Sequence, residues 1–290
     1  MKKATSIEIL TVAHKPSFIP TNSLLKPIQV GTALSGRRLK GMTYHDNEGD
    51  NISYKNGSYC ELTATYWAWK NIEADYYGLF HYRRYLSFAP DSYENPHAGK
   101  AFPNIPSALK EIHLNEEDMR KVIEQYDLIV PRKDSTKATT GESSLYDQYA
   151  NEHYIKDLDY CINYVEKKYK NIAPYLDCLH DSRAYFCNMF IMKKGLFDEY
   201  CSFIFDVLDS FEKENNISGY NTQQYRVTGF LAERLTNVFI HYLIGTGKYK
   251  VKELQIAYFE NTEPIQTVEP IQEDAISVVL AADNFYVPYV

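Results

Sequence analysis

The sequence lacks most of the short motifs that identify an enzyme class. It has no P-loop, no G-x-S-x-G and no H-E-x-x-H, and no D-x-D follows an apolar strand. The templates for P-loop kinases, serine hydrolases and zinc proteases therefore do not apply. The five cysteines form no C-x-x-C pair, which argues against metal-binding and disulfide frameworks and suits a reducing compartment.

Long apolar runs and an excess of positive charge are also missing. No window approaches the roughly 18 apolar residues that span a bilayer, and the N-terminal apolar stretch is too short for a secretion signal. Acidic residues outnumber Lys and Arg by 38 to 31, so the net charge is −7. We therefore predict a cytoplasmic protein, either free or peripheral at the inner face of the membrane, with no nucleic-acid partner.

The apolar pattern predicts an α/β fold. Runs rich in β-forming residues alternate with amphipathic segments, which is typical of a mostly parallel central sheet flanked by helices. The expected strands are 7–16, 27–34, 76–86, 127–132 and 184–194. The expected helices are 58–71, 115–126, 148–169, 196–214 and 220–244, the first opened by a capping box of Ser58 and Glu61. Residues 133–144 are polar and small and predict a loop.

The C-terminal part differs in composition from the rest. Residues 260–274 are rich in Pro, Gln and Glu and predict a linker. A new β-rich run, "AISVVLAADNFYVPYV", follows at 275–290. A lone strand cannot form a domain, so this run is either an edge strand of the main sheet or the start of a second domain.

The stretch "GLFHYRRY" places His81, Arg83 and Arg84 at the end of an expected core strand. Side chains alternate along a strand, so we expect His81 and Arg83 on one face and Arg84 on the other. Two arginines there can grip a diphosphate, with a hydrogen bond donated by the histidine, or can clamp carboxylates between structural elements. The residues alone favour neither alternative.

Other polar residues also follow expected strands or loops. His14 and Lys15 end the first strand, where α/β folds bind ligands. The loop "HDNEGDNISYKN" is either a nucleoside pocket or a solvated turn that leads into a helix cap. Its polar candidates are Asp46, Asp50, Asn51, Ser53 and Lys55.

Two further polar residues interrupt apolar segments in the C-terminal half of the chain. Asn188 lies in an expected buried strand and needs hydrogen-bond partners there. Glu233 adjoins Arg234 on an expected helix, either as half of an ion pair or as a general base.

Several segments taken together resemble a known family. "VAHKP", "YCELTATYWAWKN", "YYGLFHYRRYL", "YDLIVP", "CNMFIMKK" and "YRVTGFLAERL", in this order, resemble a bacterial capsular-polysaccharide family long filed as a domain of unknown function, DUF4422, with galactofuranosyltransferase-like members. The resemblance implies a GT-A-like, Rossmann-type glycosyltransferase domain over residues 1–259. The partners it implies are a UDP-sugar donor and a glycan or lipid-linked oligosaccharide acceptor.

The resemblance also implies roles for individual residues. His81, Tyr82 and Arg83 take the place of the usual metal-binding D-x-D, so no divalent metal or other cofactor is expected to be required. The implied donor-binding residues are His14, Lys15, Asp50, Asn51, Ser53, His81, Arg83, Arg84, Asn188 and Arg226.

Inverting transfer needs a base. Glu233 is the first candidate, with Gly229 letting backbone approach the ligand; Asp181 is the competitor and His153 the third.

The run 275–290 resembles the first strand of family 8 glycosyltransferases, which implies a second glycosyltransferase domain in the same polypeptide. The competing hypothesis is a catalytically inactive module that binds a nucleotide sugar or glycan.

Overall fold

Hydrophobic cores pack on both faces of the central sheet, and alternate side chains of its first strand point into one core or the other. The structure, a computed structural model, describes residues 4–90, 98–263 and 276–277. In β1 (Ile7–Ala13), Ile9 packs into one hydrophobic cluster while Leu10 and Val12 pack into another on the opposite face. This alternation places apolar side chains on both sides of a strand that is buried along most of its length.

The central sheet is mostly parallel, which confirms the predicted fold class. Its order is β12 (Val251–Leu254), β8 (Leu128–Pro131), β11 (Phe190–Lys193), β5 (Tyr76–His81), β1, β3 (Leu25–Gln29) and β4 (Tyr44–His45). The pairs β12–β8, β5–β1, β1–β3 and β3–β4 are parallel, and β11 runs antiparallel to both neighbours. The sheet is extended by β13 (Ile256–Asn261), which pairs with β6 (Arg84–Leu86) and β7 (Gly99–Asn104).

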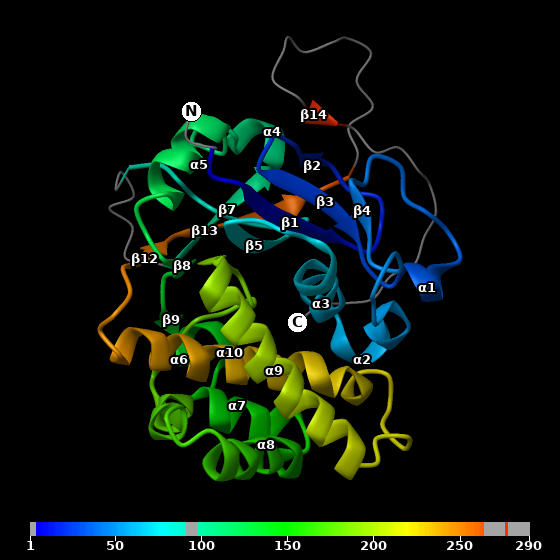
Figure 1. Cartoon of the computed structure of the whole chain (residues 1–290), viewed down its shortest axis with the longest axis vertical. Helices are drawn as coiled ribbons and strands as arrows, with labels where there is room; N and C mark the ends of the chain where they lie inside the picture. The colour runs from blue at the N-terminus through cyan, green and yellow to red at the C-terminus, as the bar shows by residue number, and fades with distance from the viewer. Residues whose placement is uncertain (1–3, 91–97, 264–275, 278–290) are drawn as a thin grey trace.

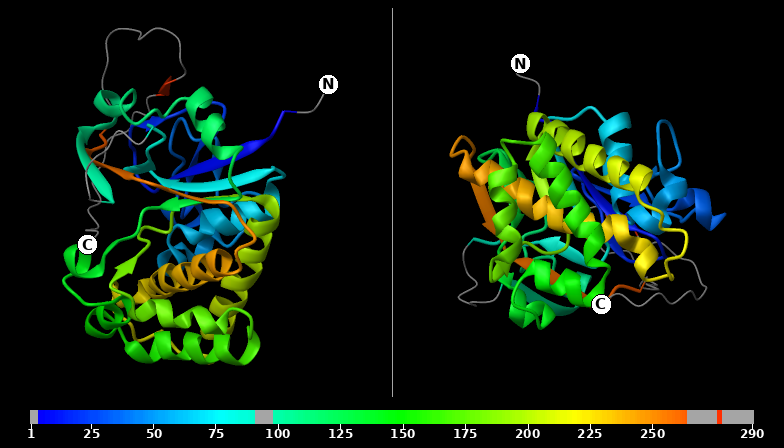
Figure 2. Two further views of the ribbon diagram at one scale, coloured as in Figure 1. Left: turned by 90° about the vertical axis from the view of Figure 1, so that its left-hand side faces the viewer. Right: turned by 90° about the horizontal axis from the view of Figure 1, so that it is seen from below.

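Helices cover both faces of this sheet (Figure 1). The larger layer contains α3 (Leu62–Asn71), α7 (Leu145–Glu152), α8 (Ile155–Lys168), α9 (Lys194–Glu214) and α10 (Val227–Gly245). The smaller layer, on the other side of the sheet in both Figure 1 and the left view of Figure 2, contains α4 (Ile105–Ala108) and α5 (Glu116–Ile123). Within the described residues, no helix combines the length and the apolarity needed to cross a bilayer.

Short elements fill the connections between these layers. The helical ones are α1 (Thr32–Ser35), η1 (Ser53–Lys55), α2 (Asn56–Tyr59), α6 (Thr136–Thr140), η2 (Ala173–His180) and η3 (Gln224–Arg226). The remaining strands form two small pairs, β9 (Asp134–Ser135) with β10 (Arg183–Ala184) and β2 (Ile19–Pro20) with β14 (Ile276–Ser277).

Several element boundaries differ from those that the pattern predicts. The expected helix 148–169 is two helices, because His153 and Tyr154 adopt extended backbone conformations. The expected loop 133–144 contains β9 and α6, whose start is capped by the Ser135 hydroxyl accepting from the backbone of Ala138. The expected strand 184–194 is regular only at its two ends, in β10 and β11.

The predicted capping box of Ser58 and Glu61 is wrong. Cys60 adopts a left-handed conformation (φ 51°) that separates α2 from α3, and Glu61 stands at the N-cap of α3 without a side-chain cap. Ser58 is buried inside α2, and its hydroxyl bonds the hydroxyl of Thr228 on α10. The helix therefore starts later than predicted, and α2 is fixed to α10.

The described part of the C-terminal segment extends past the expected domain boundary. Strand β13 continues to Asn261, beyond the boundary predicted after residue 259. Ile276 and Ser277 pair with β2 outside the central sheet. The rest of the predicted linker and of the run 275–290 lies outside the described residues.

A buried carboxylate fixes the loop that leads from β4 into the helices. Asp46 is fully buried and accepts hydrogen bonds from the backbone amides of Gly31 and Thr32 at 2.8 and 3.0 Å. It also accepts from the hydroxyls of Ser53 and Thr63 at 2.5 and 2.7 Å. One side chain thus satisfies four donors, two from the start of α1 and one each from η1 and α3.

We expect Asp46→Ala to lower the free energy of unfolding by roughly 3 kcal/mol or more, because it leaves several buried donors without partners. Urea unfolding followed by circular dichroism measures this loss. The control is Asp50→Ala, which removes an exposed carboxylate from the same loop and should change stability by less than about 1 kcal/mol. Equal losses in the two variants would contradict a structural role for Asp46.

Candidate active site

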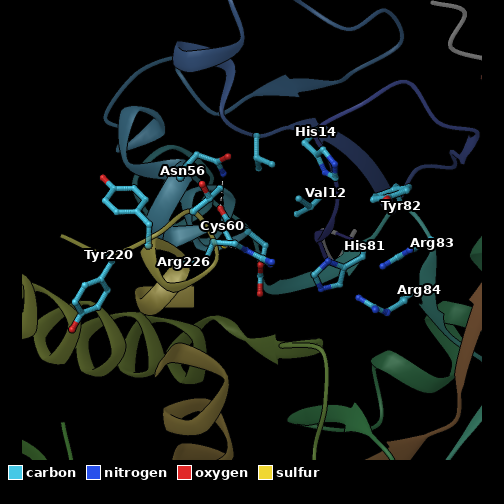
Figure 3. A pocket seen from close by; sticks show the side chains of 15 residues that line it. Val12, His14, Asn56, Cys60, His81, Tyr82, Arg83, Arg84, Tyr220 and Arg226 are labelled. Atoms are coloured by element: carbon cyan, nitrogen blue, oxygen red, sulfur yellow. Dashed lines mark hydrogen bonds between the residues drawn. The ribbon is translucent and has the colours of Figure 1, made fainter. Parts of the chain in front are cut away.

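A cavity of about 480 Å³ opens at the carboxyl ends of β1 and β5 (Figure 3). This volume lies in the range of small-molecule sites, and the carboxyl edge of parallel strands is where α/β folds bind ligands. The lining residues come from the carboxyl ends of β1, β3 and β5 with the loops that follow them, from the start of β6, from the α2–α3 segment and from the residues before α10. They are Val12, His14, Val30, Asn56, Gly57, Cys60, Glu61, His81, Tyr82, Arg83, Arg84, Tyr220, Thr222, Tyr225 and Arg226.

Five basic side chains line this cavity, and we call them the cation cluster: His14, His81, Arg83, Arg84 and Arg226. All five were predicted from the sequence as donor-binding residues, and the structure brings them together. Lys15 stands just outside the lining set, with its ammonium 5.5 Å from the centre of the Tyr82 ring. The acidic chain therefore concentrates the positive charge of three arginines at one site.

The backbone at the end of β5 differs from the prediction. The strand ends at His81, Tyr82 and Arg83 form a two-residue turn, and Arg84 begins β6 directly opposite His81. In an antiparallel pair, residues directly opposite each other share a face. His81 and Arg84 are thus the face-sharing pair, not His81 and Arg83, because a hairpin interrupts the expected strand.

His81 is oriented by the loop before β11. Its Nε2 lies 2.7 Å from the carbonyl oxygen of Cys187, and since a carbonyl only accepts, Nε2 carries the proton. Burial lowers the pKa of His81, and Arg84 lowers it further while Glu61 raises it. In the neutral ring Nδ1 carries no proton and can only accept a hydrogen bond. His81 therefore cannot donate the predicted hydrogen bond to a diphosphate while it bonds Cys187.

The pKa of His14 is lowered to about 4. Desolvation inside the cavity is the largest cause, followed by repulsion from Lys15, Arg83, Arg226 and His81. The residue as a whole is exposed, so water screens part of this repulsion, and the direction of the shift is what matters for binding. The part of the shift that comes from Lys15, Arg83 and Arg226 reflects a positive local potential, and the same potential attracts an anion.

Arg226 is held in place from two sides. Its Nε donates to Cys60 Sγ at 3.5 Å, and its guanidinium lies 5.1 Å from the centre of the Phe230 ring. Burial raises the pKa of Cys60 to about 11, so this sulfur remains a thiol rather than a nucleophile. Gly229 lets α10 approach Cys60, because a Cβ at Gly229 would lie 3.0 Å from that sulfur. Gly229 was predicted to let the backbone approach a ligand, but in the structure it makes room for the Cys60 side chain.

Glu233 does not line the cavity, but it holds the backbone of a loop beside the cavity in place. One of its carboxylate oxygens accepts from the backbone amide of Cys187 at 2.8 Å, and the other lies 3.0 Å from Arg234 Nη1. Asn237, one turn further along α10, exchanges hydrogen bonds with both backbone groups of Tyr185. Helix α10 thus holds the loop that positions His81 and Asn188, and the Glu233 carboxylate is already engaged on both oxygens.

Other predicted residues lie outside the lining set. Ser53 is buried against Asp46, and Asn51 makes local hydrogen bonds in the turn before η1. Asp50 is bonded to α3, where its amide donates to Asn71 and its carboxylate accepts from Tyr66. Asp181 is exposed, with its carboxylate 3.9 Å from His241 Nε2. His153 is stacked on Phe230, with ring centres 4.1 Å apart. The structure does not bring these five residues to the cavity.

Sequence reasoning missed part of the cavity wall. Asn56 lies at the start of the four-residue helix α2, and Tyr220, Thr222 and Tyr225 lie in the segment before α10, which the sequence pattern had assigned to the predicted helix 220–244. Glu61 was assigned to a helix cap instead of a site. Its hydrogen-bond partner Asn188 lies 127 positions later in the chain, so no local pattern could have identified this contact.

In residues 4–90, 98–263 and 276–277, no three His, Cys, Asp or Glu side chains are grouped so that they could hold a metal ion. The expectation that no metal is required remains a prediction.

A family model matches most of the chain. The chain belongs to the DUF4422 family, a domain of unknown function whose model matches residues 8–243. Comparison with curated proteins gives no significant match.

A solved structure is similar over most of the chain. The apo structure of the WbbM bifunctional glycosyltransferase has a TM-score of 0.81 and 37% sequence identity, and the match covers 91% of this chain and 48% of that one. The chain thus spans about half the length of that glycosyltransferase.

We expect inorganic pyrophosphate to raise the pKa of His14 by about one unit or more, because a bound anion favours the imidazolium form. NMR titration of the His14 ring protons, assigned with His14→Asn, measures the shift with and without pyrophosphate. His113, which lies outside the lining set beside Asp118, should not respond. Binding of pyrophosphate without any change at His14 would place the anion elsewhere.

Proposed function

We propose that the chain is a glycosyltransferase domain that transfers a sugar from a UDP-sugar donor to a glycan acceptor. The observation that carries this proposal is the cation cluster, three arginines and two histidines lining one cavity at the carboxyl edge of the sheet. The likeness to the WbbM bifunctional glycosyltransferase supports the same class of reaction.

The cation cluster fits the chemical need of this reaction. When a glycosyl group leaves a UDP-sugar, negative charge develops on the diphosphate, and fixed positive groups stabilise that charge. Arginines offer several donors in a planar fork that matches phosphate oxygens. We expect transfer to proceed without manganese, because the arginines supply the positive charge that a metal ion bound to D-x-D supplies in other GT-A glycosyltransferases.

The finer features of the proposal follow from the family resemblance. The donor sugar is galactofuranose, the transfer inverts the anomeric configuration, and the acceptor is a growing capsular or cell-surface glycan or its lipid-linked precursor. A second glycosyltransferase domain acts in the same polypeptide, at the inner face of the membrane.

A screen of UDP-sugars tests the donor. UDP-galactofuranose should raise the melting temperature more than UDP-galactopyranose or UDP-glucose, both with and without manganese. Slow UDP release from the bound donor in water then separates a working enzyme from an inactive binding module, since release requires cleavage of the sugar–phosphate bond. Absence of binding by every UDP-sugar would overturn the proposal.

We expect Arg83→Ala and Arg226→Ala each to weaken UDP binding by about tenfold to a hundredfold, because each removes a charge-assisted hydrogen bond to phosphate. Isothermal titration calorimetry measures the dissociation constants. The matched control is Arg120→Ala on α5, where the arginine pairs with Glu116 and Glu124 on the other face of the sheet. If Arg120→Ala weakens binding as much as the other two variants do, net charge rather than the cavity explains the effect.

A further inference from the structure

Among the lining residues that the structure describes, Glu61 is the one carboxylate. It is half-buried at the start of α3, and its Oε1 accepts a hydrogen bond from Asn188 Nδ2 at 2.8 Å. No hydrogen bond from the described part of the chain reaches its second oxygen. Glu61 therefore presents a fixed carboxylate with one oxygen available to the cavity.

The backbone around Glu61 is strained at three places. Cys60, which precedes it, has φ 51°, and Cys187 and Asn188, which lie on the opposite side of its hydrogen bond, have φ 77° and 49°. Non-glycine residues adopt this region at an energetic cost and persist there only when the surroundings hold them. Such strain concentrates at functional sites, and here it surrounds one carboxylate.

Glu61 also joins the two sides of the cavity. Figure 3 shows Asn56 and Cys60 across the cavity from His81 and Arg84. The Glu61 side chain starts next to Cys60 and reaches Asn188, whose neighbour Cys187 orients His81. Its carboxylate thus lies between the side that carries most of the cation cluster and the side lined by Tyr220, Thr222 and Tyr225.

We propose that Glu61 is the catalytic base of the transfer and that Asn188 is its positioning residue. This inference rests on the proposed function. The acceptor hydroxyl gives its proton to Glu61 while its oxygen bonds the anomeric carbon of the donor. The bond from that carbon to the phosphate oxygen breaks, and its electron pair leaves with UDP. The products are the glycosylated acceptor, UDP and the protonated carboxylic acid, which returns its proton to water.

Charge favours Glu61 over its nearest competitors. Protonation of His81 would create one more cation beside Arg84, whereas protonation of Glu61 gives a neutral acid. Glu233 has both oxygens engaged, with Cys187 and with the buried Arg234, and stands outside the lining set. Glu61 is the carboxylate that combines access to the cavity with an available oxygen.

The test compares two nucleophiles on the same donor. Water needs a base to attack the anomeric carbon, but azide is already an anion and does not. In Glu61→Gln, which keeps the shape of the side chain, UDP release from UDP-galactofuranose in water should fall by about a hundredfold or more. Release in sodium azide should stay within about threefold of the wild type, with sodium chloride as the salt control, and the dissociation constant for UDP should be unchanged. Glu61→Asp, which keeps a carboxylate, should retain part of the hydrolysis.

Matched variants make the outcome decisive. Asp181→Asn removes a carboxylate outside the cavity and should hydrolyse the donor as the wild type does. Arg83→Gln should slow release in water and in azide alike, because it acts on the leaving diphosphate. The proposal is overturned if Glu61→Gln hydrolyses the donor normally, or if it loses UDP release equally in water and in azide. It is also overturned if His81→Asn, and not Glu61→Gln, releases UDP slowly in water but at a near-normal rate in azide. A wild type that binds no UDP-sugar would overturn the proposed function instead.

Discussion

The candidate site depends on one strained connection, the left-handed pair Cys187 and Asn188. The carbonyl of Cys187 orients His81, and the amide of Asn188 holds Glu61, so the two residues fix one group on each side of the cavity. Neither conformation is favourable for a residue with a Cβ. The connection therefore requires support from outside, and α10 supplies it through Glu233 and Asn237.

That support also explains a buried charge in α10. Arg234 is almost completely buried, and it is compensated by Glu233 and by Gln148 of α7. A buried ion pair adds little net stability compared with apolar residues of the same size, but removing one partner is costly. The pair is better understood as the anchor that keeps the Glu233 carboxylate pointed at the backbone of Cys187. The helical layer thereby determines the geometry at the edge of the sheet.

The sequence predicted the parts of the site that lie on regular strands. The existence and the starts of β1 and β5 were predicted correctly from long apolar runs, and parallel pairing brings their carboxyl ends together. The predicted strands 7–16 and 76–86 nevertheless run past the observed ends at Ala13 and His81. The hairpin at Tyr82 and Arg83 was missed, since a two-residue turn without glycine, asparagine or aspartate carries no turn signal. The break between α2 and α3 at Cys60 was missed for the same reason, because cysteine does not predict a left-handed residue.

The two glutamates show why chain order is a weak guide to chemistry. Glu233 followed the strand that carries Asn188, as a base is expected to do, yet its partners are a backbone amide and a buried arginine. Glu61 was predicted to form part of a helix cap, yet its partner is the buried amide of Asn188, from the loop before β11. A carboxylate acts as a base only if an oxygen faces the reacting atoms, and that depends on which donors the fold has already assigned to it. For Glu61 that donor is Asn188, which lies 127 positions away in the sequence and reaches the carboxylate only when the chain is folded.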